Sequence, residues 1–353
     1  MRIPVLLIAL SVVAGVAVGY MPQLGFVGWL YHHCALGLYE RGKSQFDQRQ
    51  FIEAQRTVTS ALQFCPLLPE AHMLKAVTHD FLGEDIEAIN EYNFCITQGH
   101  ERAYAYRCRA NIQFKVGDTV GAIQGYNKAI ERYPKDFELY LSRARAWKRL
   151  NAWDCALMDC DSVLQLVPGC AEALVERGNI RSCMHNPDGA INDYNSAIKE
   201  NPNFAYAYSC RGMARTCLGD HIGALRDQSM QVKLNPNSDC AYEDRGYALF
   251  NLGRYAESIR DFDQALLLNP ISEGAYWKRG QTRLKMGDLK GALRDLDKAL
   301  ALDPQDDLAL NQRGQCKFRL GDRAGAKRDL EQALKLYPNW QVARFLLKQM
   351  NSK

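Results

Sequence analysis

A proline returns every 34 residues along most of this chain. The series is Pro134, Pro168, Pro202, Pro236, Pro270, Pro304 and Pro338, with Pro66 two periods earlier and His100 standing between. A period of this length, held without insertion or deletion, indicates a supersecondary unit that stacks on copies of itself. Nine units follow, at 35–68, 69–102, 103–136, 137–170, 171–204, 205–238, 239–272, 273–306 and 307–340.

Each unit has the pattern of two short helices. In 273–306, apolar residues recur at helical spacing on both sides of Gly287-Asp288, and Asp303-Pro304 ends the second stretch. A small residue recurs at one place in the first helix, at Gly42, Ala76, Ala110, Ala144, Gly178, Gly212, Gly246, Gly280 and Gly314. Glycine inside a helix costs up to about 1 kcal/mol relative to alanine, so its return implies a close approach of another helix.

On these residues the chain resembles the tetratricopeptide repeat family. The shared features are the 34-residue period, the early small residue (as Gly212), the alanine pair (as Ala190 and Ala197) and the closing proline (as Pro202), over 306 of 353 residues. The resemblance implies an all-α fold, a right-handed α-solenoid of nine helix-turn-helix repeats, whose first helices line a concave groove for partner segments. His100, in place of a proline, and Gln231, in place of a small residue, predict looser packing at the second and sixth units.

Short segments flank the repeats. Residues 1–20 are predicted to be a transmembrane anchor or a signal peptide, 21–34 a linker or interfacial segment, and 341–353 a helix and tail that cap the last unit. The cap would place Val342, Phe345, Leu346 and Met350 on one side.

The N-terminal stretch admits more than one interpretation. Residues 3–20 carry no charge and would span roughly 27 Å as a helix, close to the thickness of a bilayer core. The second alternative is a cleaved secretory signal, which the small residues near positions 15–19 would suit, and a buried helix is the third. The first two predict a membrane protein with one N-terminal anchor, or a secreted or periplasmic one.

Composition argues against several classes of function. A formal net charge of +4 is too small to indicate a general nucleic-acid binder. Twelve cysteines without a Cys-x-x-Cys spacing disfavour zinc ribbons and redox relays. No phosphate-binding loop or nucleophile motif is present, so the sequence predicts no catalytic residues, no metal, no cofactor and no small-molecule substrate.

A basic residue precedes each small residue of the first helices, and most have an acid sixteen residues later. Six arginines from Arg143 to Arg313 are followed by aspartates, and Lys75 is followed by Glu91. The spacing predicts structural ion pairs rather than an anion-binding stripe. Arg109 faces Gly125 instead, which makes it the better candidate for binding a partner.

Positions that vary between units are free to bind a ligand. If the first helices line the groove, as the resemblance implies, a basic patch with two aromatic residues falls on the first helices of the third and fourth units. It comprises Tyr104, Arg107, Asn111, Phe114, Lys115, Arg145, Lys148 and Arg149. Arg107, Asn111 and Phe114 share a helix face and could converge on a carboxylate or acidic peptide. The alternative is an ordinary solvated surface.

A second set of variable positions is aromatic. It comprises Tyr247, Phe250, Trp277 and Phe318. Large aromatic residues at such positions suggest an anchor pocket for a partner, and packing between repeats is the alternative.

These features together predict a non-enzymatic scaffold that is membrane-associated or exported and holds an extended or helical segment of a partner protein in its groove. The alternatives are an RNA-binding helical-repeat protein, which the small net charge disfavours, and an enzyme with a site hidden in the groove.

Overall fold

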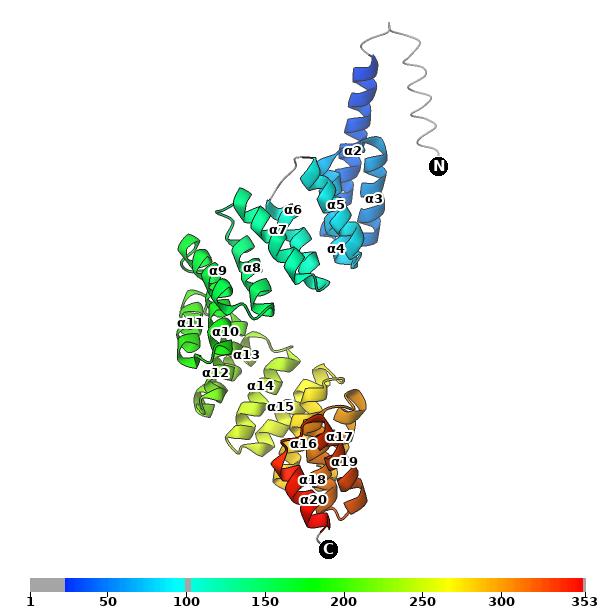
Figure 1. Ribbon diagram of the computed structural model, residues 1–353. Coiled ribbons are helices and arrows are strands. Elements are labelled where there is room, and N and C mark those ends of the chain that lie inside the picture. Colours follow the sequence, from blue (N-terminus) through cyan, green and yellow to red (C-terminus); the bar gives the residue numbers. More distant parts are fainter. Residues whose placement is uncertain (1–22, 99–102, 352–353) are drawn as a thin grey trace. The chain divides into compact units, whose positions relative to one another are not determined.

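The computed structural model describes residues 23–98 and 103–351, and within them it contains helices and no strands (Figure 1). The helices are α2 (Gln23–Asp47), α3 (Phe51–Phe64), α4 (Pro69–Leu82), α5 (Asp85–Thr97), α6 (Ala103–Lys115), α7 (Thr119–Arg132), α8 (Phe137–Arg149), α9 (Trp153–Leu166), α10 (Ala171–Cys183), α11 (Pro187–Glu200), α12 (Ala205–Cys217), α13 (His221–Leu234), α14 (Asp239–Asn251), α15 (Tyr255–Leu268), α16 (Glu273–Met286), α17 (Leu289–Leu302), α18 (Asp307–Arg319), α19 (Arg323–Leu336) and α20 (Gln341–Asn351). The predicted all-α helical-repeat solenoid is confirmed.

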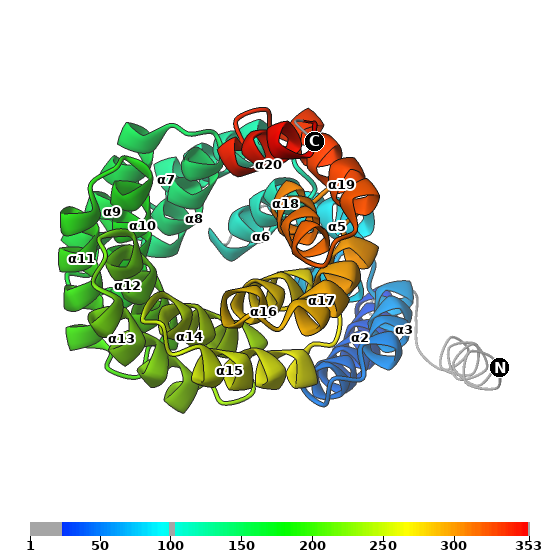
Figure 2. The same cartoon turned by 90° about the horizontal axis from the view of Figure 1, so that it is seen from below.

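The chain divides between residues 168 and 169 into two compact units. Within each unit, the even-numbered helix packs against the odd-numbered helix that follows it, and each pair packs against the next. In the second unit, α10, α12, α14, α16 and α18 form an inner row, and α11, α13, α15, α17 and α19 form an outer row (Figure 2). The even-numbered helices of that unit therefore share one concave surface.

Glycine and aspartate separate the two helices of many pairs. Gly287 ends α16 with φ of +84°, a conformation that only glycine adopts without strain. The next residue, Asp288, accepts a hydrogen bond from the backbone N–H of Gly291 and so caps α17. Gly219-Asp220 and Gly321-Asp322 do the same before α13 and α19. This local chemistry sets the length of each hairpin.

The core explains the small residues of the first helices. Tyr194 lies fully buried against Gly178, where an added Cβ would come 2.5 Å from the tyrosine ring. Leu330 packs in the same way on Gly314, where an added Cβ would come 2.7 Å from the leucine side chain. A contact that short is not tolerated, so these glycines permit the close approach of the paired helices that the sequence implied.

The two expected irregularities have different outcomes. Next to His100, which lies outside the described residues, a buried cluster joins α4, α5 and α6 through Tyr92 and Ile112, and the looser packing expected there stays a prediction. In the sixth helix pair, α12 and α13, Gln231 is buried. Gln228 is also buried, and it stands 34 residues after Tyr194, at the same position of the repeat. The side-chain carbonyl oxygens of both glutamines have no hydrogen-bond partner among the described atoms. This core is thus closely packed but polar.

The C-terminal helix α20 packs against α18 and α19. It does so through Ala343, which is completely buried. Val342 and Phe345, expected on the packing side, are 47% and 60% exposed, because the helix is turned to bring its small residue against its neighbours.

The N-terminal expectations concern residues that are mostly outside the described part of the chain. The predicted anchor or signal at 1–20 lies there entirely. The segment expected as a linker is helical from Gln23 and continues without interruption into the first helix. Among the described residues, no helix combines the length and apolar character needed to span a bilayer.

Candidate functional site

A ladder of ion pairs joins the two helices within the pairs. In six consecutive pairs, an arginine donates from Nε and Nη2 to an aspartate on the following helix, with N···O distances of 2.6–3.2 Å. The six pairs are Arg143–Asp159, Arg177–Asp193, Arg211–Asp227, Arg245–Asp261, Arg279–Asp295 and Arg313–Asp329. Lys75 contacts Glu91 at 2.6 Å in the same place. The predicted structural pairing is confirmed.

The ladder also connects neighbouring pairs. The third guanidinium nitrogen, Nη1, donates to a side-chain oxygen on the second helix of the preceding pair, at 2.6–2.9 Å. We call this residue the joint acceptor; it lies sixteen positions before the arginine. The joint acceptors are Asn93 for Arg109, Asn127 for Arg143, Asn195 for Arg211, Asp263 for Arg279 and Asp297 for Arg313.

The aspartates of the ladder are buried, with side chains 3–9% exposed. Burial raises the pKa of Asp159, although Arg143 opposes this shift. Because each aspartate is committed to its arginine, the ion pairs hold the two helices of a pair together.

Arg109 and Arg41 lack the acid sixteen residues later, where Gly125 and Thr57 stand, and Arg109 is the more buried of the two. Its Nη1 donates to Asn93 at 2.7 Å, and its Nε is buried without a hydrogen-bond partner. Burial lowers the pKa of Arg109, and its guanidinium lies 5.6 Å from the centre of the Tyr106 ring. Its role in partner binding stays a prediction.

The predicted basic patch gathers on α6 and α8, in the first unit. Arg107 pairs with Glu138 on α8 and lies over the ring of Tyr104. Lys115 contacts Asp85 at 2.7 Å, and the Asn111 side chain accepts a hydrogen bond from a buried tyrosine hydroxyl.

The α8 side of the patch is engaged as well. Arg149 donates to the Phe114 carbonyl at 2.9 Å and lies 5.0 Å from the centre of its ring. Arg145 is exposed and Lys148 is half-buried. The structure thus brings the predicted residues to one surface, where their side chains already make contacts within the chain.

The aromatic set lies on α14, α16 and α18, in the second unit. Tyr247 and Phe250 stack with ring centres 6.2 Å apart, and Tyr247 is exposed. Trp277 packs against a buried cluster formed by α17, α18 and α19, and its indole N–H is buried without a hydrogen-bond partner. Phe318 is half-buried. Trp277 is therefore largely a packing residue, whereas Tyr247 is available at the surface.

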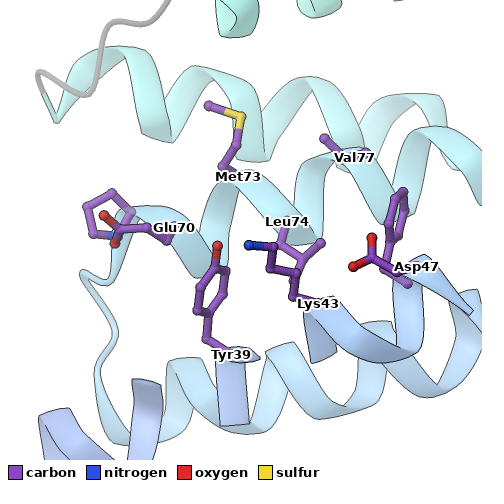
Figure 3. Close-up of a pocket in the computed structure, with 9 residues that line it drawn as sticks. Tyr39, Lys43, Asp47, Glu70, Met73, Leu74 and Val77 are labelled. Carbon is purple, nitrogen blue, oxygen red and sulfur yellow. The ribbon is translucent and has the colours of Figure 1, made fainter. Parts of the chain in front are cut away.

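A cavity that sequence reasoning did not single out opens between α2 and α4. It has a volume of about 250 Å³. Figure 3 shows Tyr39 and Lys43 rising from α2 toward α4, which carries Leu74 and Met73. Two carboxylates flank it, those of Asp47 and Glu70, and the side chains of Lys43, Asp47 and Glu70 are exposed while the apolar ones are half-buried. An apolar floor with charged edges suits an amphipathic peptide segment.

The signal that could have located this cavity is positional. Tyr39, Lys43 and Asp47 stand two periods before Arg107, Asn111 and Lys115, the positions already assigned to the groove. Register alone does not reveal which stretch of the groove is hollow, because that depends on how neighbouring side chains fill it. Among the described residues, no cluster of His, Cys, Asp or Glu could hold a metal ion.

Part of the repeat sequence matches known protein families. Residues 243–307 and 307–340 each match a family model described as tetratricopeptide repeat. Residues 243–340 therefore consist of tetratricopeptide repeats, and the resemblance of the chain to that family is supported. Members of this family typically act as protein-interaction scaffolds and are generally non-catalytic. No curated protein matches the sequence significantly.

Solved structures share the fold of this chain. The APC/C hetero-tetramer Cut9-Hcn1 matches at 16% identity with a TM-score of 0.61, over 90% of this chain and 76% of that one. A tetratricopeptide repeat protein from Parabacteroides merdae matches at 23% identity and 0.56, over 70% and 98%. PilF of Pseudomonas aeruginosa matches at 16% and 0.55, over 60% and 97%. Identities this low establish a common architecture.

Proposed function

We propose that this protein is an interaction scaffold that binds a peptide or helical segment of a partner protein on the surface of its even-numbered helices. The observation that carries the proposal is the cavity between α2 and α4. Its position matches the groove register of the family, and it is an open, partly apolar recess of about 250 Å³. An apolar side chain of the segment would fill the floor between Tyr39 and Met73.

The charges around the cavity favour a segment of mixed charge. Lys43 offers a cation, and Asp47 and Glu70 offer two carboxylates, all with exposed side chains. Exposed pairs contribute little affinity, about 0–1 kcal/mol each, so they select orientation while the apolar floor supplies binding energy.

Peptide selection tests this proposal without knowledge of the natural partner. Peptides selected from a displayed random library on the wild-type protein would be measured against Val77→Arg, which fills the cavity, and against Glu53→Lys, which reverses an exposed charge on α3 outside it. We expect Val77→Arg to weaken binding at least tenfold and Glu53→Lys to leave it unchanged, with equal helicity by circular dichroism. Equal binding to all three proteins would exclude the cavity as the site.

We also propose that residues 1–20 attach the protein to a membrane or direct its export. Support comes from the uncharged run at 3–20. Sequencing the N-terminus of the mature protein separates an anchor from a cleaved signal. Recovery of the full-length protein in the soluble cytosolic fraction would contradict both.

A further inference from the structure

One joint of the ladder in the second unit lacks its acceptor. At Arg245 the expected residue is Ser229, in the register where Asn195 stands one period earlier and Asp263 one period later. The Ser229 hydroxyl donates to the Leu225 carbonyl at 2.7 Å. Arg245 binds Asp261 through Nε and Nη2, both at 2.7 Å, and its Nη1 has no acceptor among the described residues.

A second substitution enlarges the gap. Four positions after the ladder arginine, Arg181, Arg215 and Arg283 each add a hydrogen bond to the ladder aspartate at 2.7–2.8 Å. In the pair of α14 and α15 this position is Leu249, which is buried and apolar. The joint therefore lacks two polar side chains that adjacent joints possess.

The missing side chains leave a real recess. A cavity of about 370 Å³ lies between α13, α14 and α15, lined by Ser229, Arg245 and Leu249. Arg254 and Arg260 stand on its α15 side, with side chains 47% and 72% exposed. The recess thus lies between α14 of the inner row and α13 and α15 of the outer row, whose places Figure 2 shows.

The charge of the recess favours a single negative charge. Three guanidinium groups and the carboxylates of Glu257 and Asp261 line it, which leaves a net charge of +1. Arg254 is held by Glu257 through two hydrogen bonds of 2.7 Å, and Arg260 is 72% exposed to solvent. The less exposed donor that lacks an acceptor among the described residues is therefore Nη1 of Arg245. A dianion would meet repulsion from the two carboxylates, whereas a carboxylate matches both the charge and the planar guanidinium.

We propose that a carboxylate side chain of a partner protein enters this recess and accepts a hydrogen bond from Nη1 of Arg245. The template is in the same chain: Asp263 and Asp297 accept from Nη1 of Arg279 and Arg313 at 2.6 and 2.9 Å. The partner residue takes the place of the missing joint acceptor. Leu225 and Leu249 offer apolar contact to the rest of the partner segment, which a free carboxylate ion could not use.

The test replaces Ser229 with a larger side chain that occupies the recess. Ser229→Asn supplies the joint acceptor that Asn195 provides to Arg211 and leaves the net charge unchanged, whereas Ser229→Ala keeps the recess empty. A fluorescent oligoglutamate peptide would be titrated at fixed ionic strength, with oligoglutamine as the uncharged control. We expect the wild type and Ser229→Ala to bind oligoglutamate, Ser229→Asn to bind at least tenfold more weakly, and Ser229→Asn to melt at a higher temperature.

Three results would overturn the inference. Undiminished binding by Ser229→Asn would place the peptide elsewhere on the basic surface. Competition by acetate at the same concentration as peptide glutamate would identify a small carboxylate rather than a protein side chain. Tighter competition by inorganic phosphate would reject the carboxylate. Because Val77 lies in the first unit and outside this recess, the Val77→Arg variant should bind oligoglutamate normally, so the two proposals fail independently.

Discussion

Asp295→Asn should cost about 3 kcal/mol of local stability, because Asp295 is a buried anion that holds two cations. Its carboxylate accepts three hydrogen bonds, from Arg279 at 3.0 and 2.7 Å and from Arg283 at 2.7 Å. Its side chain is 4% exposed, and those of the two arginines are 15% and 21% exposed. Removing one partner of a buried pair costs about 3–5 kcal/mol, and the partial hydration of the arginines places the estimate at the lower end.

A matched control stands two residues away on the same helix. Asp297 accepts one hydrogen bond, from Arg313 at 2.9 Å, and its side chain is 53% exposed. Asp297→Asn should therefore cost about 0–1 kcal/mol. The two variants change charge identically, so net charge cannot explain a difference between them.

The assay must resolve local unfolding, since stability in a stacked-repeat protein is carried by units and their interfaces. Urea unfolding followed by circular dichroism gives the overall effect, and hydrogen exchange should show lost protection centred on α16 and α17. If the two variants differ by less than about 1 kcal/mol, the ladder aspartates are not the structural anchors inferred here.

Two further predictions concern titration and packing. Burial and a hydrogen bond with Asp306 raise the pKa of Glu273 to about 7, with Asp303 adding to the shift and Lys278 opposing it. The folded state therefore binds this proton more tightly than the unfolded state does. The free energy of unfolding should fall as the pH rises from about 4.5 to 7. Glu273→Gln should flatten that part of a stability profile measured by urea unfolding, and an unchanged slope would contradict the assignment. Gly178→Ala should lower the melting temperature because its Cβ would meet a buried ring at 2.5 Å, whereas Gly37→Ala, with no atom within 4 Å, should raise it; a shift of the same sign in both would contradict the packing argument.

The fold was predictable because its causes are local and repeated. Gly287-Asp288 ends one helix and caps the next within a few residues. A glycine at the register of Gly178 implies that the paired helix approaches closely in each repeat where it occurs. The ladder could also be predicted, since a spacing of sixteen residues between Arg279 and Asp295 is fixed once the hairpin is fixed.

The surface was less predictable, because it depends on which side chains find partners within the chain. Arg107 has the register of a groove residue, but whether it is available depends on Glu138, which lies in the next pair. The cavity between α2 and α4 likewise depends on the volumes of Tyr39, Leu74 and Met73 together. A period identifies equivalent positions; it does not say which of them leave space.

Arg109 and Arg245 each lack one partner of the ladder, but the missing partner differs. At Arg109 the acid is replaced by Gly125, and the helices have closed around the gap: a Cβ at Gly125 would lie 3.0 Å from that of Ala110. The buried Nε of Arg109 then has no hydrogen-bond partner. At Arg245 the acid remains, its hydrogen bond raises the pKa of the guanidinium, and the acceptor on the neighbouring pair is missing instead. Because Arg245 is held in place by Asp261 at the edge of an open recess, a partner carboxylate can approach its Nη1 without breaking the ion pair that joins α14 and α15.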